Sequence, residues 1–391
     1  MPDRVVSVDI FLFERPRDTP YLGGVGADET MIDTRYVVRG FNGTVYPLND
    51  RSLVVRVRTA GGVEGWGETY GLIAPKATAA IIADLLGPYL CTLQLGHPAA
   101  AWQSLYDLQR NRGYWGGYYA DALAALDIAL WDIYAQNMGQ SLQAAMGRPG
   151  GGRLPGYISG LPADTGAARL DMAQHWAAQG FDALKIPISA TDDGDVVGEF
   201  ARLRAGLGAD HKIALDMHWA FAPQDAIALA ADLAVHDPWF LEAPVAPEDI
   251  AAQVAVAKGI EAPLALGEEW RTDWDYAPRA GHGIPAILQP EMGHTGITQF
   301  QAIAKRGAAN NAQLIPHATI GLGIFMAASL RASLACGATC HEFQHSVYGR
   351  NAALLEGSAP CEAGHFIIGD SPGLGVKPTA EAFEMLSKIE I

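Results

Sequence analysis

Alternating apolar and polar residues mark the first part of the chain as strands. The alternation runs through residues 5–13 and 52–59, and an Ala-Gly-Gly turn leads into a third run at residues 62–68. These three runs predict a small antiparallel meander. Residues 17–49, between the first two runs, form a long glycine-rich segment. We expect this segment to be a loop, either a functional lid or a disordered stretch.

The pattern becomes helical from residue 78 to about residue 147. Residues 119–133 carry apolar side chains almost all the way around a helix, which predicts that this helix is largely buried. After a turn-forming segment at residues 148–153, short apolar strands alternate with helical stretches. The expected strands are residues 156–159, 183–188, 213–215, 239–241, 264–266, 286–288, 314–316 and 342–343.

Eight strands that alternate with helices favour a closed parallel barrel over an open sheet. This rhythm stops after residue 348. We therefore expect an α/β fold in three parts. Residues 1–150 form an N-terminal α+β capping domain, residues 151–348 form the barrel domain, and residues 349–391 form a C-terminal segment that packs back on the capping domain.

Composition and charge narrow the range of partners. The 391 residues include 43 acidic and 27 basic ones, a formal net charge of −16, which disfavours nucleic acids and anionic membrane surfaces. No apolar run reaches membrane-spanning length, and the first residues do not form a signal peptide, so we expect a cytoplasmic protein. The spacing of Cys336, Cys340, His341 and His345 does not match known zinc sites, which favours reduced cysteines.

Polar residues suited to catalysis stand at the ends of most expected strands, where barrels of this kind carry their chemistry. At intervals of 23–26 residues the chain carries Asp216, Glu242, Glu268, Glu291, His317 and Glu342. Lys185 lies within the second expected strand. A register this regular places the side chains around one rim of the barrel.

Three of these carboxylates, on Asp216, Glu242 and Glu268, would repel one another unless a cation lies between them. Hard oxygen donors suit Mg²⁺, or Mn²⁺ as its substitute. A helix N-cap role would explain any one of these acids, because βα loops often end in Asp or Glu. The regular spacing of all three favours a metal site.

A divalent cation on three carboxylates suits removal of a proton α to a carboxylate, because it stabilises the enolate that forms. His317 lies two strands beyond the last expected ligand and is the expected base. Glu291, one strand earlier, would hydrogen-bond the imidazole and fix its tautomer. His218, two residues after Asp216, could protonate a departing hydroxyl. The alternative for His218 is capping the third helix or stacking on Trp219.

Short motifs in a fixed order run along nearly the whole chain. They are Gly65-Trp-Gly-Glu68, Asp127-Ile-Ala-Leu-Trp-Asp132, Gly180-Phe-Asp-Ala-Leu-Lys185, Phe240-Leu-Glu-Ala-Pro244, Leu266-Gly-Glu268, Gln289-Pro290, Gly296-Ile-Thr298 and Ile315-Pro-His317. Together they resemble the mandelate racemase subgroup of the enolase superfamily. The resemblance implies a modified (β/α)₇β TIM barrel with a capping domain, and Mg²⁺ on Asp216, Glu242 and Glu268. It also implies specificity loops near residues 21–29 and 68–75, and a homo-oligomer, either an octamer or a dimer.

The chain departs from the family pattern at two places. Many members carry Lys-x-Lys on the second strand, with the second lysine as a base opposite the histidine, whereas this chain has Lys185-Ile-Pro187. Proline cannot take a proton, which argues against a two-base racemase. The resemblance suggests that Lys185, as the first lysine of the pattern, would instead contact the substrate carboxylate. The second departure is Glu291 where Asp is usual, which leaves His294 as an alternative partner of His317.

The remaining arrangement is similar to galactonate-dehydratase-like members. It predicts a hydro-lyase of carbohydrate catabolism in which His317 removes the C2 proton of an aldonate. His218 then assists loss of the C3 hydroxyl, and a 2-keto-3-deoxy sugar acid forms.

The expected substrate is a monocarboxylic sugar acid of five or six carbons, lyxonate-like or galactonate-like. Lys185, Glu342, Tyr21 and Trp270 are expected to bind it. Two alternatives stay open. One is a cycloisomerase or epimerase of sugar acids or lactones on the same scaffold, and the other is a non-catalytic sugar-acid-binding barrel.

Overall fold

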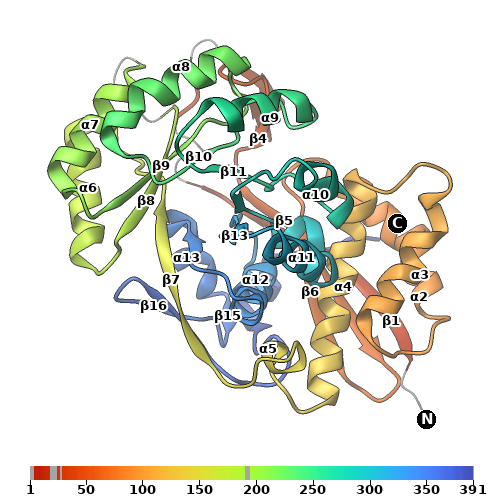
Figure 1. Cartoon of the computed structure of the whole chain (residues 1–391). Helices are drawn as coiled ribbons and strands as arrows, with labels where there is room; N and C mark the ends of the chain where they lie inside the picture. Colours follow the sequence, from red (N-terminus) through yellow and green to blue (C-terminus); the bar gives the residue numbers. More distant parts are fainter. Residues whose placement is uncertain (1–3, 18–23, 27–28, 190–193, 391) are drawn as a thin grey trace.

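The N-terminal alternating segments form a four-stranded antiparallel sheet in the computed structural model, which describes residues 4–17, 24–26, 29–189 and 194–390 (Figure 1). Three of its strands match the predicted meander, and the fourth comes from the C-terminus. In the order of the sheet they are β19 (Leu386–Lys388), β1 (Val5–Arg15), β5 (Asp50–Thr59) and β6 (Glu64–Tyr70).

Helix α4 (Gly117–Asn137) packs against β6 so closely that only glycine fits at two positions of the strand. A Cβ atom added at Gly65 would lie 2.3 Å from the carbonyl oxygen of Ala129, and one added at Gly67 would lie 1.9 Å from that of Ala125. The Gly65-Trp-Gly67 motif therefore sets the distance between helix and sheet. The other helical elements of the capping domain are α1 (Pro75–Ile81), η1 (Ile82–Leu86), α2 (Gly87–Leu90), α3 (Pro98–Arg110) and α5 (Leu142–Ala145).

The glycine-rich segment that we expected to be a loop contains a second, three-stranded antiparallel sheet. Its strands are β2 (Thr30–Ile32), β3 (Tyr36–Val38) and β4 (Val45–Pro47). The prediction was wrong here because the strands are only three residues long and all three residues of β2 are exposed, which leaves little periodic signal. Arg51 of β5 anchors the small sheet, since its Nη1 donates a hydrogen bond to the hydroxyl of Tyr36 at 2.7 Å.

Eight parallel strands form the barrel, at the positions that the sequence predicts (Figure 1). They are β7 (Gly152–Ser159), β8 (Ala183–Pro187), β9 (Lys212–Asp216), β10 (Leu241–Glu242), β11 (Leu264–Leu266), β12 (Ile287–Leu288), β13 (Gln313–Leu314) and β14 (His341–Phe343). The ladder runs from β7 to β13 in sequence order, and β14 pairs with β7. A bond from the Thr339 amide to the Leu314 carbonyl (3.1 Å) links the last two strands. Side chains including Tyr157 and Phe240 fill the interior.

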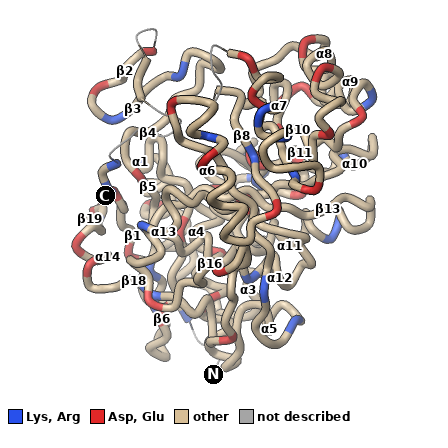
Figure 2. The backbone as a smooth tube through the Cα atoms, turned by 90° about the vertical axis from the view of Figure 1, so that its left-hand side faces the viewer, with Lys and Arg blue, Asp and Glu red and all other residues tan. Residues whose placement is uncertain are grey.

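A helix follows each of the first seven barrel strands, which makes the barrel (β/α)₇β. These helices are α6 (Gly166–Ala178), α7 (Val196–Leu207), α8 (Pro223–Leu233), α9 (Ile250–Gly259), α10 (Asp273–Ala280), α11 (Met292–Ala309) and α12 (Ile324–Cys336), with a short 3₁₀ turn η2 (Ala234–His236) after α8. Among the described helices, none is both long and apolar enough to cross a membrane. In the view of Figure 2, acidic and basic residues are interspersed over the helices around the barrel.

The C-terminal segment contacts both domains. Strand β19 pairs with β1 of the capping domain, with Phe11 opposite Lys388. Strands β16 (Cys361–Glu362) and β17 (His365–Ile368) form a hairpin, and β17 pairs antiparallel with β7 of the barrel. The segment therefore extends the start of β7, ahead of the residues of β7 that pair with β14, and also packs on the capping domain as we expected. Its other elements are α13 (His345–Ala352), β15 (Leu355–Glu356), β18 (Lys377–Pro378) and α14 (Ala380–Glu384).

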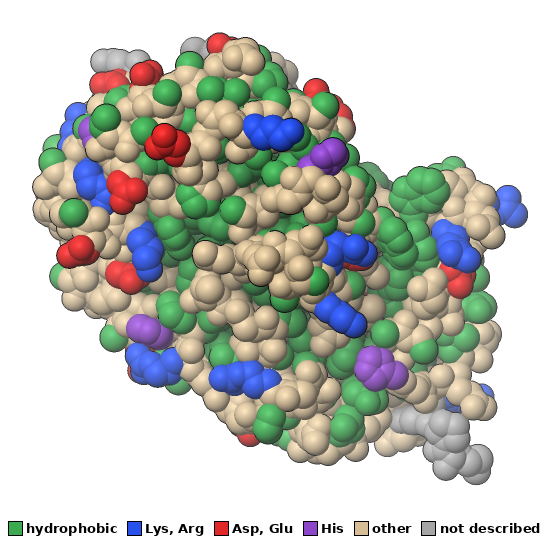
Figure 3. Space-filling view, in the orientation of Figure 1, with side chains coloured by type: hydrophobic (Ala, Val, Ile, Leu, Met, Phe, Trp, Pro, Cys, Tyr) green, Lys and Arg blue, Asp and Glu red, His purple; other side chains and the backbone are tan. Residues whose placement is uncertain are grey.

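Aromatic side chains pack across the boundary between the capping domain and the barrel. Trp274 of α10 stacks on Tyr106 of α3, with ring centroids 5.0 Å apart, and Tyr106 in turn stacks on Trp102. The space-filling view shows hydrophobic side chains in the hollow between the two domains (Figure 3). Stacked aromatic pairs of this kind stabilise the domain contact beyond the area that they bury.

A buried carboxylate also joins the two domains. Glu68 at the end of β6 accepts hydrogen bonds from the amides of Gly323 (3.0 Å) and Ile324 (2.6 Å), among others, at the start of α12. Glycine is required nearby, because a Cβ atom at Gly321 would lie 2.2 Å from Glu68 Oε1. The glycine-rich turn before α12, which resembles a phosphate-binding loop, thus binds a carboxylate of the protein itself.

Glu68→Gln should destabilise the protein by about 2–3 kcal/mol. The side-chain NH₂ group of glutamine would face backbone N–H groups that now donate hydrogen bonds to the carboxylate, and these bonds would be lost. Thermal or urea unfolding measures this loss. Glu64→Gln on the same strand is the matched control, since its side chain is 45% exposed and should change stability by less than about 0.5 kcal/mol. Equal stability of the two variants would contradict the role of Glu68 as a link between domains.

Candidate functional site

The residues predicted at the strand ends gather at one end of the barrel. Asp216 and Glu242 lie directly opposite each other on β9 and β10. Glu268 lies two residues beyond β11, Glu291 immediately precedes α11, and His317 lies beyond β13. The shared register of parallel strands brings these side chains together, because their carboxyl ends meet on one face of the barrel.

Lys185 of β8 is buried among three carboxylates. Its Nζ atom is 2.7 Å from Glu242 Oε1, 3.2 Å from Glu342 Oε1 and 3.5 Å from Asp216 Oδ2. Burial alone would lower the pKa of Lys185, but the charges of Glu242, Glu342 and Asp216 raise it well above its ordinary value. The amine therefore stays protonated and is a fixed positive charge in the site.

Negative charge is in excess around this lysine. Burial raises the pKa of Glu242, and the charges of Asp216, Glu268 and Glu342 raise it further against the opposing effect of Lys185. Crowded carboxylate oxygens of this kind have the donor chemistry that a hard divalent cation requires.

Among the described residues, Glu242, Glu268 and His317 each offer one possible ligand atom, and these three atoms lie within 4.8 Å of one another. They are close enough to share a cation. The structure thus gathers two of the three predicted metal ligands. The third, Asp216, is turned toward its neighbour His218, whose Nε2 is 2.9 Å from Asp216 Oδ2.

His317 lies between two carboxylates. Its Nδ1 is 2.8 Å from Glu291 Oε2, and its Nε2 is 2.8 Å from Glu268 Oε2. Burial lowers the pKa of His317, whereas the nearby carboxylates, led by Glu268 and Glu342, raise it well above its ordinary value. Glu291 is held by the amide of Thr319, which donates a hydrogen bond of 2.7 Å to the same oxygen that contacts His317.

His218 is buried on a strained turn. Both His218 (φ 46°) and the next residue, Trp219 (φ 55°), have left-handed backbone conformations that are rare outside glycine. The His218 amide donates to Asp216 Oδ1 at 3.0 Å, which helps to hold the turn. Its Nδ1 atom is buried without a hydrogen-bond partner among the described residues. A buried imidazole nitrogen without a partner is suited to meet a ligand.

Family models match two regions of the chain. Residues 42–147 match the mandelate racemase/muconate lactonizing enzyme N-terminal domain, and residues 168–382 match the enolase C-terminal domain-like model. The chain belongs to the mandelate racemase/muconate lactonizing enzyme family of the enolase superfamily. This membership confirms the fold expected from the sequence motifs.

Individual relatives support the same family. A crystal structure of an enolase superfamily member from Agrobacterium tumefaciens is 46% identical, covers all of both chains and superimposes with a TM-score of 0.96. A D-galactarolactone cycloisomerase of Agrobacterium fabrum is 29% identical over 84% of this chain and 89% of its own. A D-galactonate dehydratase of Ralstonia pickettii is 28% identical over 85% of this chain and 90% of its own.

Two predicted residues of this family member, Trp270 and His294, stand apart from the cluster. Tyr21 lies outside the described residues. Trp270 is buried in the core, where its indole stacks on Tyr276 with ring centroids 5.2 Å apart. His294, the alternative partner of His317, is 2.7 Å from Asp121 through its Nδ1. The contact of His317 is instead with Glu291.

Two contacts of the cluster were missed by sequence reasoning. Gln289 donates a hydrogen bond from Nε2 to Glu242 Oε2 at 2.6 Å, and Phe41 of the small sheet stacks on His218. The contact of Gln289 could have been predicted from its position directly after β12, because the acids of the cluster also lie at or just after the ends of barrel strands. Phe41 is 177 positions away from His218 in the sequence, and no local pattern indicates this contact.

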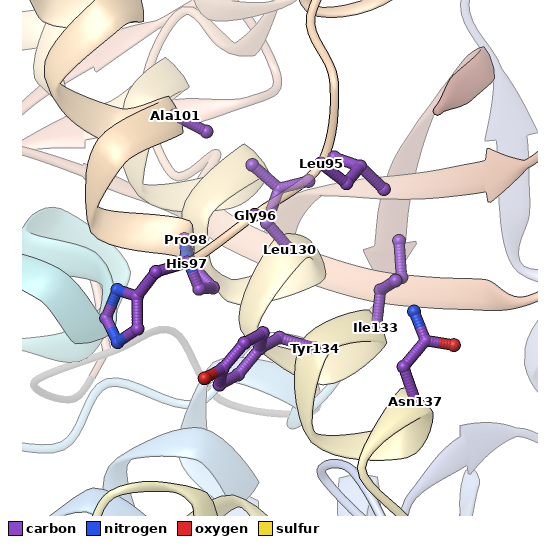
Figure 4. Close-up of a pocket in the computed structure, with 9 residues that line it drawn as sticks. All are labelled: Leu95, Gly96, His97, Pro98, Ala101, Leu130, Ile133, Tyr134 and Asn137. Atoms are coloured by element: carbon purple, nitrogen blue, oxygen red, sulfur yellow. The ribbon is translucent and has the colours of Figure 1, made fainter. Parts of the chain in front are cut away.

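A separate cavity of about 250 Å³ lies on the capping domain between α4 and the segment leading into α3 (Figure 4). Its lining is mostly apolar, with His97, Tyr134 and Asn137 as polar members, and it contains no carboxylate. This cavity therefore lacks the carboxylate oxygens that a Mg²⁺ site requires, and the barrel end is the candidate active site.

Proposed function

We propose that this enzyme is a Mg²⁺-dependent acid-sugar dehydratase that converts an aldonate to a 2-keto-3-deoxy sugar acid. The observation that carries the proposal is the placement of a fixed cation, Lys185, and two histidines with different partners around one set of carboxylates. The preferred substrate class is a monocarboxylic sugar acid of five or six carbons. The R. pickettii relative named as a D-galactonate dehydratase supports this class.

Proton removal falls to His317. Glu291 at its Nδ1 holds the ring, and Nε2, which is 2.8 Å from Glu268 Oε2, is the nitrogen that would take the C2 proton. A cation bound to Glu268 would weaken the charge that keeps this imidazole protonated. Lys185 would contact the substrate carboxylate and favour the charge that develops there. Mg²⁺ held by Asp216, Glu242 and Glu268 would supply further positive charge against this negative charge. His317 would bind Mg²⁺ less readily than these oxygens, because Mg²⁺ prefers oxygen ligands.

Elimination requires a proton donor for the leaving group. His218 would give its proton to the C3 hydroxyl, so that the C3–O bond breaks and water leaves while the electrons of the C2–H bond form a C2–C3 double bond. The resulting enol tautomerises to the 2-keto-3-deoxy acid. Asp216, 2.9 Å from the imidazole, supports the protonated form of His218.

A cycloisomerase of sugar-acid lactones is the second candidate, because the A. fabrum relative is named as a D-galactarolactone cycloisomerase. It shares the removal of a proton α to a carboxylate and differs in its product. Two-base epimerisation is disfavoured, because Pro187 stands where a second base on β8 would be needed.

We expect the purified protein with Mg²⁺ to convert at least one member of a library of mono- and diacid sugars into a 2-keto acid, detected as its semicarbazone. A product of unchanged composition from a lactone would favour the cycloisomerase. Neither product from any library member, together with saturable binding of a sugar acid, would favour a non-catalytic binding protein and overturn the dehydratase proposal.

A further inference from the structure

The turn between β3 and β4 brings two side chains of the capping domain to the active site. The turn is closed by hydrogen bonds from the Gly43 amide to the Arg39 carbonyl (2.9 Å) and from the Arg39 amide to the Thr44 carbonyl (3.0 Å). Gly43 has a φ of 67°, which favours glycine. Phe41 and Asn42 therefore lie at the tip of a short, closed hairpin.

The hairpin is fixed to the rest of the capping domain. Arg39 is buried, and its Nη1 donates to the Gly24 carbonyl at 2.9 Å and pairs with Glu29 Oε2 at 2.8 Å. At the other end of β3, Arg51 bonds the hydroxyl of Tyr36. A buried ion pair at one end and hydrogen bonds at both ends hold the tip in place and so fix where it contacts the barrel.

The tip meets the barrel at His218. The Phe41 ring stacks on the imidazole with ring centroids 5.6 Å apart and an angle of 26° between planes. Asn42 Nδ2 lies 3.5 Å from the His218 carbonyl oxygen, which is long for a hydrogen bond, and its Oδ1 accepts from the Thr44 amide at 2.9 Å. The capping domain thus contacts both the ring and the backbone of the same barrel residue.

His218 needs such support because its backbone does not favour the conformation that it adopts. Two successive residues in the left-handed region can relax to ordinary conformations unless surrounding contacts hold them. On one side the Asp216 carboxylate accepts from the His218 amide and contacts Nε2. On the other side the Phe41 ring limits rotation of the imidazole.

We propose that Phe41, assisted by Asn42, is a positioning residue that orients His218 for proton delivery to the leaving hydroxyl. The inference rests on the proposed function, in which His218 is the acid of the elimination step. Among the described residues, the Phe41 ring stacks on His218 and makes no ring contact with His317. Its removal therefore slows loss of the hydroxyl while proton removal at C2 continues.

Phe41→Leu tests this separation of the two steps. In D₂O, keto-acid formation by the variant should fall about 10- to 100-fold, as for loss of other supporting groups around a site. Deuterium incorporation at C2 of recovered substrate should stay within about threefold of wild type, so the ratio of exchange to product rises. Phe41→Trp, which keeps an aromatic face, should recover most of the elimination rate. Met31→Ala, at an exposed position of the same small sheet, is the matched control and should behave as wild type.

A rise in KM with unchanged kcat, or equal loss of exchange and elimination, would overturn the inference and make the hairpin a general cover of the site. A second measurement needs no substrate. The ring protons of His218 should carry an upfield ring-current shift in the NMR spectrum of the free protein, and this shift should disappear in Phe41→Leu. Retention of the shift would overturn the inference even if the enzyme is a dehydratase. Its loss in a protein that dehydrates no sugar acid would support the contact and overturn only the proposed function.

Discussion

Replacing His317 with asparagine should lower the rate of C2 proton removal by about 10⁴-fold, the upper range for a general base. An α-proton beside a carboxylate is too weakly acidic to be lost without a positioned base, and asparagine cannot accept it. The asparagine side chain still fills part of the imidazole volume and can donate a hydrogen bond to Glu291. Keto-acid formation and C2 deuterium exchange should therefore fall together, while the circular dichroism spectrum and melting temperature stay close to those of wild type.

Two companion variants decide which groups form the base. Glu291→Gln keeps the hydrogen bond to His317 Nδ1 but removes its charge, so we expect a smaller loss of about 10- to 100-fold. His294→Asn should leave C2 exchange nearly unchanged, because His294 contacts Asp121 rather than the cluster. Loss of exchange in His294→Asn with retention in His317→Asn would reverse the assignment of the base.

The barrel and its chemistry were readable from the sequence because both depend on local periodicity. Short buried strands such as β11 and β12 are apolar runs between helical segments, and the acid or histidine after each strand must lie on the same face of the barrel. Glu242, Glu268 and His317 could therefore be placed together from spacing alone. Family membership then confirmed the architecture that this spacing predicts.

What the sequence did not reveal depends on contacts between distant segments. The small sheet β2-β3-β4 has too few residues per strand to show a period, and its contact with His218 joins the first and second domains. The sequence also could not predict how the charged side chains within the cluster are oriented. Lys185 pairs with Glu242 and Glu342, and Asp216 pairs with His218. In a buried site the attraction between opposite charges is weakly screened by water, so each carboxylate orients toward the nearest positively charged group.

The motif Gly65-Trp-Gly-Glu68 shows how one short sequence serves several structural needs. Its two glycines allow α4 to approach β6, and Glu68 caps α12 of the barrel. The same motif therefore sets the packing inside the capping domain and the docking of that domain on the barrel. The hairpin tip at Phe41 reaches His218 only if this docking is maintained, so the folding of one domain contributes to the geometry of the other.

The second large effect concerns the metal. Adding Mg²⁺ should raise the melting temperature of the substrate-free protein, because a cation that binds only the folded state relieves the repulsion among Asp216, Glu242 and Glu268. At a concentration about 100 times the dissociation constant, this linkage contributes about 2.7 kcal/mol. Removal of divalent ions with a chelator should abolish turnover, and Mg²⁺ or Mn²⁺ should restore it. Melting curves measured over a Mg²⁺ titration test the site independently of activity.

The neighbouring acids Glu268 and Glu269 provide a matched pair for this experiment. Glu268→Gln removes a proposed ligand and should abolish the Mg²⁺-dependent rise in melting temperature. Glu269→Gln should retain it, because burial raises the pKa of Glu269 to about 7 and glutamine resembles the neutral form that is already populated at neutral pH. Glu269 Oε1 is also without a hydrogen-bond partner among the described residues, so the substitution removes no bond at that atom. If both variants respond to Mg²⁺ like wild type, Glu268 is not a ligand; if neither responds, the loss reflects the disturbed turn after β11 rather than the removal of one carboxylate.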